Sequence, residues 1–121
     1  MNSRASKVLI VDDESSMRFL LRIILESAGY EVLEAQHGAA ALERVKESRP
    51  NLIVTDLMMP VMNGRDLVGR LRADPETAGI PILLLSANPN AVVAAVDAVV
   101  GKPFDPEAVV EAARSLAGSG G

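Results

Sequence analysis

Short apolar segments and longer amphipathic segments alternate along the chain. The short segments are rich in Val, Ile and Leu, which is typical of strands covered on both faces of a parallel sheet. They predict strands at 8–11, 31–35, 52–55, 81–85 and 98–101. Apolar residues at helical spacing predict helices from about 17 to 29, at 39–48, at 65–73 and from 106 to about 117.

Capping and turn residues separate these predicted elements. Ser15 and Ser16 are expected to cap the first helix, and Gly29 to end it in a left-handed conformation. Pro50 ends the second helix, and Pro106 stands in the first turn of the last one. The alternation of strands and helices predicts an α/β fold, with a doubly wound parallel sheet and helices on both faces.

The connection between the last two strands departs from this regular alternation. A crossover that contains a helix needs at least about 10–12 residues. The segment 87–97 barely reaches that length, and Pro89 delays the start of any helix within it. We therefore expect the fourth helix to be short or missing.

Composition narrows the class of protein. A chain of 121 residues with 49% hydrophobic and 23% charged residues suits one compact domain. We expect a folded domain at 7–117, a flexible N-terminus at 1–6, and a flexible tail or linker stub at 118–121. The chain has no cysteine and no pattern of a secretory signal or membrane span. We therefore expect a cytoplasmic location and no contact with membranes.

Charge and aromatic content argue against nucleic acid as a ligand. The 12 Lys and Arg residues face 16 Asp and Glu residues, which gives a net charge of −4. Such a chain lacks the basic surface that neutralises a phosphate backbone. One Tyr and two Phe residues also offer little surface for stacking bases.

Polar residues follow four of the predicted strands directly. Asp12 and Asp13 follow the first strand, Asp56 the third, Ser86 the fourth and Lys102 the fifth. The carboxyl ends of parallel strands meet at one edge of the sheet, where ligands bind in this type of fold. Clustered carboxylates repel one another unless a cation joins them, and oxygen ligands alone favour Mg²⁺. Because Mg²⁺ commonly pairs carboxylates with phosphate oxygens, the pocket indicates phosphoryl chemistry.

Three motifs resemble one family closely. They are VLIVDDE at 8–14, DLMMPVMNG at 56–64 and KPF at 102–104, and they occur together with Ser86. In this combination the chain resembles the receiver domain of two-component response regulators, over roughly residues 7–116. The resemblance implies a flavodoxin-like sheet of five parallel strands in the order 2-1-3-4-5. It also implies a signalling module that assists its own phosphoryl transfer and autodephosphorylation, and not an enzyme.

The resemblance assigns roles to the pocket residues. Asp56 would be the phosphoacceptor and form an acyl phosphate. Ser86 would bind a phosphoryl oxygen and act as a switch, and Lys102, which precedes a cis peptide bond in the family, would stabilise the phosphoryl charge. The phosphoryl group would come from a histidine kinase or a histidine phosphotransfer protein, and the downstream partner is open.

The resemblance also implies a Mg²⁺ cofactor and its ligands. Asp13 would bind the ion directly and Asp12 mainly through water. Asp56 and the backbone carbonyl of Met58 would complete the protein's share of the ligands.

Two features bear on how such a module would signal. Val99 replaces the aromatic switch residue that the family usually places three residues before the strand-five lysine. On a helical wheel of the first helix, Arg18, Arg22 and Glu26 form a narrow polar stripe within a wide apolar arc. The resemblance makes part of this arc a docking surface for the partner, although packing against the last helix would also account for it; the surface comprises Met17, Phe19, Leu20 and Ile23.

Simpler roles for several of these residues stay open. The three aspartates also suit helix capping, Lys102 alone would be a solvated lysine, and His37 is most simply an exposed loop residue. The main alternative function is a pseudo-receiver, a protein-interaction domain that acts independently of phosphorylation. A Mg²⁺-dependent phosphatase or phosphotransferase is a third candidate, but its usual motif spaces two aspartates by one residue, whereas Asp12 and Asp13 are adjacent.

Overall fold

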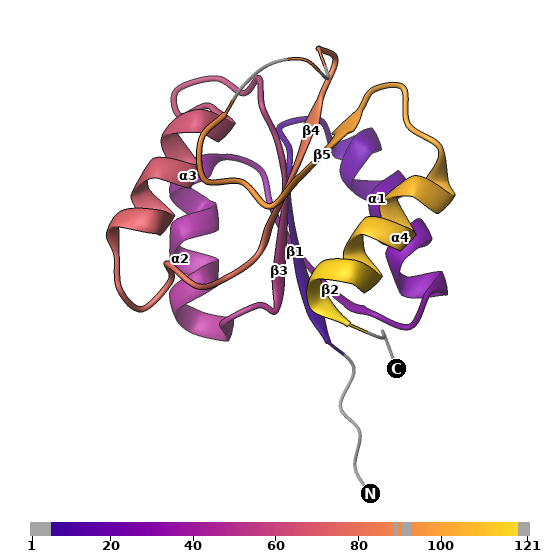
Figure 1. Cartoon of the computed structure of the whole chain (residues 1–121), viewed down its shortest axis with the longest axis horizontal. Coiled ribbons are helices and arrows are strands. Elements are labelled where there is room, and N and C mark those ends of the chain that lie inside the picture. The colour runs from indigo at the N-terminus through magenta and orange to yellow at the C-terminus, as the bar shows by residue number, and fades with distance from the viewer. Residues whose placement is uncertain (1–5, 89, 91–92, 119–121) are drawn as a thin grey trace, which may run out of the picture.

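The sheet has the predicted topology. The computed structural model describes residues 6–88, 90 and 93–118. Its five strands are parallel and lie in the order β2-β1-β3-β4-β5, which confirms the doubly wound α/β fold (Figure 1). The strands are β1 (Lys7–Val11), β2 (Glu31–Ala35), β3 (Leu52–Asp56), β4 (Ile82–Ser86) and β5 (Ala98–Gly101).

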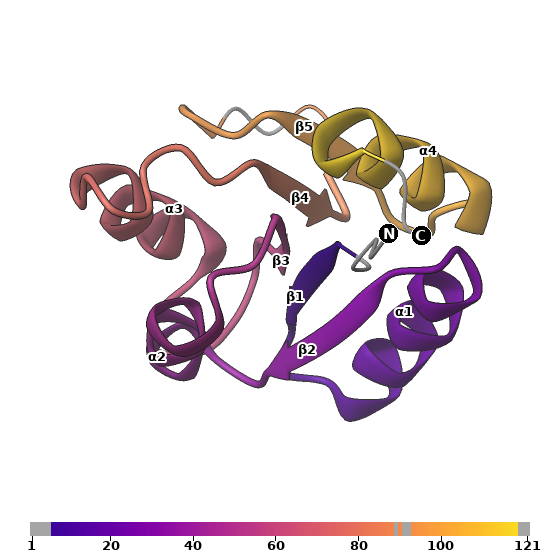
Figure 2. The ribbon, with the colours of Figure 1, turned by 90° about the horizontal axis from the view of Figure 1, so that it is seen from below.

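Helices cover both faces of this sheet. Among the described residues they are α1 (Ser15–Ser27), α2 (Gly38–Ser48), α3 (Gly64–Ala73) and α4 (Pro106–Ala117). Helices α1 and α4 lie on one face, and α2 and α3 lie on the other, as the view from below also shows (Figure 2).

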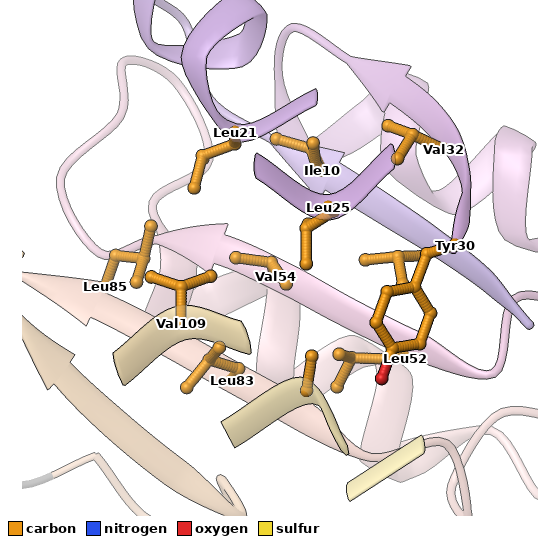
Figure 3. Close-up of a cluster of buried hydrophobic side chains, with 12 residues drawn as sticks. Ile10, Leu21, Leu25, Tyr30, Val32, Leu52, Val54, Leu83, Leu85 and Val109 are labelled. Atoms are coloured by element: carbon orange, nitrogen blue, oxygen red, sulfur yellow. The ribbon is translucent and has the colours of Figure 1, made fainter. Parts of the chain in front are cut away.

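Each face of the sheet has its own hydrophobic cluster, because successive side chains of a strand point to opposite sides. Leu52 and Val54 of β3 pack toward α1 and α4, whereas Ile53 between them packs toward α2 and α3. In Figure 3, Leu25 of α1 and Val109 of α4 close over the first cluster. Burial of each side chain of this size contributes about 1.5–3 kcal/mol to the stability of the fold. The two clusters therefore fix the positions of the strands and of the residues at the strand ends.

The connection between β4 and β5 contains no helix in its described part, residues 87–88, 90 and 93–97, as its length predicts. The side chain of Arg72 on α3 binds the second half of this connection, at residues 95 and 97. The guanidinium donates to the carbonyl of Ala95 (2.9 Å) and to a carboxylate oxygen of Asp97 (2.8 Å). The same oxygen of Asp97 accepts the amide hydrogen of Ile82 at the start of β4 (2.8 Å). Val93 in this connection is buried and packs in a small cluster with Leu57 and Leu84.

Several predicted boundaries shift by one or two residues. Helix α1 begins at Ser15 and not near residue 17, and no side chain caps it, so the expected capping by Ser15 and Ser16 is wrong. Both serines lie inside the first turn, which the carbonyl of Glu14 closes by accepting the amide hydrogen of Arg18 (3.1 Å). Strands β3 and β4 extend to Asp56 and Ser86 themselves.

The two ends of the described chain meet beside the start of β2. The Tyr30 hydroxyl donates to the carbonyl of Gly118 (2.6 Å), and the amide of Glu31 donates to the carbonyl of Ser6 (2.9 Å). The flexibility expected at 1–6 and 118–121 otherwise lies outside the described residues and stays a prediction. No helix of the described part is long and apolar enough to span a membrane.

Candidate functional site: an acidic pocket at the carboxyl edge of the sheet

The strand ends bring the predicted pocket residues to one edge. Asp12 and Asp13 follow β1, and Asp56 ends β3 beside it. One carboxylate oxygen from each of these three residues lies within 4.8 Å of the others. The ammonium group of Lys102, just after β5, lies 2.9 Å from Oδ1 of Asp56 and 3.9 Å from Oδ2 of Asp12. The structure therefore places three carboxylates and one cation together.

The carboxylates differ in exposure. Asp12 is 1% and Asp56 8% exposed, whereas Asp13 is open to solvent. Burial raises the pKa of Asp12, and the negative charge of Asp56 adds to that, against the opposing effects of the Glu14 amide and Lys102. Oδ1 of Asp12 accepts the amide hydrogen of Glu14 (2.9 Å), but Oδ2 is buried without a hydrogen-bond partner among the described atoms.

This arrangement fits a hard divalent cation. A buried carboxylate oxygen without a partner costs free energy unless a cation or a donor satisfies it. The three clustered ligand groups offer only oxygen atoms, which suits Mg²⁺ better than zinc or copper. Because Asp13 is exposed, the pocket is open to solvent on that side, and an ion can reach the carboxylates there.

Ser86 is the last residue of β4 and is 2% exposed; the residue before it, Leu85, pairs with Asp56 on the neighbouring strand β3. Its hydroxyl donates to the carbonyl of Asn88 (2.8 Å) and accepts the Asn88 amide hydrogen (3.0 Å). The backbone carbonyl of Ser86 accepts the amide hydrogen of Lys102 (2.8 Å). Ser86 therefore connects the pocket both to the lysine and to the segment that follows β4.

The loop after Asp56 follows a tightly constrained path. A Cβ on Gly64 would lie 2.5 Å from the carbonyl oxygen of Asp56, so only glycine allows α3 to begin this close to the pocket. Val61 has φ +68°, and the amide of Met62 donates to the carbonyl of Pro60 (2.7 Å) around it, which makes a strained γ-turn. Met58 presents a 73% exposed side chain. The Lys102–Pro103 peptide is cis, as the resemblance implies.

The predicted docking surface on α1 is only partly exposed. Phe19, Leu20 and Ile23 are 64%, 43% and 46% exposed, whereas Met17 packs against the core on the α1 and α4 face. Val99 is partly buried against the small cluster of Leu57, Leu84 and Val93.

Two contacts near the pocket do not follow from the sequence pattern. His37 lies in the loop before α2, as expected, but it is half-buried and not exposed, and its Nδ1 caps α2 by accepting the amide hydrogen of Ala40 (3.1 Å). Arg18, expected in a polar stripe on α1, donates to the backbone carbonyl of Asp12 (2.7 Å). For the contact of His37, the only sequence signal is its position before a glycine and a predicted helix. No nearby residue indicates the contact of Arg18 with Asp12.

Fold and pocket together define a doubly wound α/β domain with an acidic, magnesium-type site at the carboxyl edge of its sheet. Within that class, a family model for the response regulator receiver domain matches residues 8–114. The chain belongs to this family. Receiver domains bind Mg²⁺ at an acidic pocket and interact with histidine kinases.

Individual relatives agree with the assignment. The chemotaxis protein CheY1 of Helicobacter pylori is 37% identical over 121 residues, covering 93% of this chain and 98% of its own. The DNA-binding response regulator MtrA of Mycolicibacterium smegmatis is 36% identical over 121 residues, covering 95% of this chain but 52% of MtrA, so this chain spans about half of that relative. The solved structure of Vibrio cholerae CheY4 superposes with a TM-score of 0.86 at 32% identity, covering 93% of this chain and 99% of CheY4.

Proposed function

We propose that Asp56 accepts a phosphoryl group from a phosphohistidine of a histidine kinase or histidine phosphotransfer protein, in a reaction that requires Mg²⁺. The observation that carries the proposal is the grouping of Asp56 with Lys102 at 2.9 Å and with two further aspartates within 4.8 Å. Nothing in the comparisons favours the pseudo-receiver alternative. Within this proposal, the domain is residues 7–117 and works in the cytoplasm.

The proposed transfer is a nucleophilic substitution at phosphorus. A carboxylate oxygen of Asp56 forms a bond to phosphorus, and the bond from phosphorus to the donor's imidazole nitrogen breaks. The electron pair of that bond passes to the nitrogen, which takes up a proton. Lys102 stabilises the negative charge of the phosphoryl oxygens through its ammonium group. Hydrolysis of the acyl phosphate in the same pocket would return Asp56 to its free form.

The proposed ligands of Mg²⁺ are Asp13, Asp56 and the carbonyl of Met58, with Asp12 mainly through water. The partnerless Oδ2 of Asp12 supports this assignment, because a metal-bound water would supply the donor that it lacks. When bound, Mg²⁺ supplies positive charge that offsets the carboxylates and the phosphoryl oxygens.

Ser86 is the proposed switch. Its hydroxyl has one hydrogen to donate, and in the structure that hydrogen goes to the carbonyl of Asn88 (2.8 Å). Donation to a phosphoryl oxygen would therefore release the carbonyl of Asn88 from this hydrogen bond. Since Val99 cannot make the rotamer change of an aromatic residue, we infer that the signal passes through the segment after β4. The exposed side chains of Phe19, Leu20 and Ile23 are the proposed docking surface for the phosphoryl donor, together with the partly buried Met17.

A thermal titration tests the proposal. Ligand binding to the folded state raises stability by about 2.7 kcal/mol at 100 times the dissociation constant. We expect Mg²⁺ to raise the melting temperature of the domain, and beryllium fluoride, a phosphoryl mimic, to raise it further. The Asp56→Asn variant should lose the response to the mimic. An unchanged melting temperature with both ligands would exclude the phosphoacceptor function and favour the pseudo-receiver.

A second assay separates this function from a phosphatase. Turnover of a small phosphoester such as p-nitrophenyl phosphate should be negligible. If turnover occurred and persisted in Asp56→Asn, the pocket would act on small substrates without the proposed phosphoacceptor.

A further inference from the structure

Arg18 links helix α1 to the turn that carries two of the proposed metal ligands. Its side chain is 16% exposed and forms an ion pair with Glu34 of β2. Nη1 donates to the backbone carbonyl of Asp12 (2.7 Å), while Nε donates to the carboxylate of Glu34 on β2 (3.0 Å). The guanidinium therefore bridges the turn to the neighbouring strand.

The bonded carbonyl belongs to the peptide group between Asp12 and Asp13. A peptide group is planar, so fixing its carbonyl also fixes the direction of the Asp13 amide and the position of the Asp13 Cα. The amide of Asp12 donates to Ala35 on β2 (3.2 Å), and Oδ1 of Asp12 accepts from the amide of Glu14 (2.9 Å). Arg18 adds a hydrogen bond from a side chain to the peptide group that leads into the exposed Asp13.

Glu34 keeps Arg18 in this orientation. Its carboxylate binds two guanidinium groups, through Oε1 to Arg18 (3.0 Å) and through Oε2 to Arg22 (2.6 Å). Burial raises the pKa of Glu34, but the hydrogen bonds from Arg22 and Arg18 outweigh burial, so the pKa lies below its ordinary value. At neutral pH the carboxylate is ionised and both arginines are held by charge-assisted bonds.

We propose that Arg18, oriented by Glu34, is a positioning residue that fixes the peptide group between Asp12 and Asp13 and thereby sets the affinity of the pocket for Mg²⁺. The inference rests on the proposed function, because it assumes that this pocket binds the ion. Removal of a group that hydrogen-bonds to a metal ligand, without binding the metal itself, typically lowers metal affinity by about 10–100-fold. Arg18 would act on the metal through the backbone, without touching it.

Arg22 offers a matched control for a purely structural role. It lies one turn further along α1, binds the same carboxylate of Glu34, and also pairs with Glu26 (2.7 Å). Within the described part of the chain, the hydrogen bonds of Arg22 go to Glu34 and Glu26 and not to Asp12. Loss of either arginine removes one guanidinium from Glu34, but only loss of Arg18 frees the carbonyl of Asp12.

The experiment compares Mg²⁺ binding to Arg18→Gln, Arg22→Gln and the unsubstituted domain by isothermal titration calorimetry. We expect Arg18→Gln to weaken binding about tenfold or more and Arg22→Gln to change it less than about twofold. Arg18→Lys should restore part of the affinity, because an ammonium group also donates to a carbonyl. Equal dissociation constants for the two glutamine variants would overturn the inference while leaving the proposed function intact. A lack of Mg²⁺ binding by the unsubstituted domain would overturn both.

A measurement on the metal-free protein tests the contact itself. The carbonyl ¹³C resonance of Asp12 should shift in Arg18→Gln and remain in place in Arg22→Gln, because hydrogen bonding changes the shielding of a carbonyl carbon. If Arg18→Gln did not fold, Glu34→Gln would serve instead, since it leaves Arg18 in place but removes the charge that orients it. Glu34→Gln should weaken Mg²⁺ binding, and an unchanged dissociation constant would overturn the role of Glu34.

Discussion

Replacing Asp12 by Asn should stabilise the metal-free domain. The carboxylate oxygens of Asp12 and Asp56 lie within 4.8 Å of each other, so at an effective dielectric constant of 20 their charges repel by at least about 3.5 kcal/mol. The attraction of Lys102 at 3.9 Å is about 4.3 kcal/mol on the same scale, so these two interactions nearly cancel. The burial of an ionised group with a partnerless oxygen then decides whether the substitution stabilises or destabilises the domain. This burial costs about 1–3 kcal/mol of stability.

Asparagine removes this charge with little change of shape. Its Oδ1 still accepts the amide hydrogen of Glu14, and Lys102 keeps its closer partner Asp56. We expect Asp12→Asn to raise the stability of the metal-free domain by about 1–3 kcal/mol. With an unfolding entropy of about 2.1 cal/mol/K per residue, each kcal/mol raises the melting temperature by about 4 °C. Asp13→Asn, at an exposed position, is the control and should have a smaller effect.

The dependence of stability on pH provides a second check. Because the pKa of Asp12 is raised on folding, the folded state binds the proton more tightly than the unfolded state. The stabilising contribution of this group is therefore fully present below its unfolded pKa, and it is lost as the pH rises through its folded pKa. Melting curves in EDTA should show that the stability advantage of Asp12→Asn over the unsubstituted domain grows as the pH rises through the folded pKa of Asp12. A lower melting temperature for Asp12→Asn at neutral pH, or an advantage that shrinks as the pH rises, would refute this reasoning.

Three further substitutions test the surroundings of the pocket. Val61→Gly should raise the free energy of unfolding in urea by up to about 1 kcal/mol. The positive φ costs a branched residue about 1–2 kcal/mol, whereas the greater conformational entropy that glycine loses on folding costs about 0.5–1 kcal/mol. A lower free energy of unfolding would contradict the strained turn. Gly64→Ala should lower the urea midpoint, because its Cβ would collide with the Asp56 carbonyl, whereas Gly69→Ala on the same helix meets nothing within 4 Å and should not. Arg72→Ala should cost about 2–3 kcal/mol through its bonds to the carbonyls of residues 78, 80 and 95, and faster amide exchange near Asp97 should accompany it. Unchanged exchange would argue against Arg72 as the anchor of that segment.

The strands and the pocket could be predicted from the sequence for one physical reason. Apolar runs mark strands that are buried on both faces, and the first charged residue after such a run lies at the carboxyl edge. The runs before Asp12 and Asp56 therefore place both residues correctly at that edge. The short crossover follows from chain length alone.

Contacts between distant parts of the chain could not be predicted in this way. Arg72 is one of several arginines on an amphipathic helix, and nothing near it indicates that Asp97, 25 positions later, is its partner. Arg18 likewise fits a polar stripe on α1, and only the packing of α1 beside β2 brings it to Glu34 and to the carbonyl of Asp12. Periodicity reports which side of a helix is polar, but the partner of each polar group depends on the tertiary fold.

The bond between Tyr30 and Gly118 determines where a neighbouring segment would attach. It ties the end of α4 to the start of β2, at the amino edge of the sheet, and Figure 1 shows the end of α4 and the start of β1 on that side. The acidic pocket lies at the opposite edge, about 16 Å away along a five-residue strand. Any segment that follows Gly118 therefore starts remote from Asp56. Phosphorylation of the pocket could affect such a segment through a conformational change of the domain, or through a later part of the segment that reaches back along the domain surface. The first residues of the segment would not contact the pocket directly.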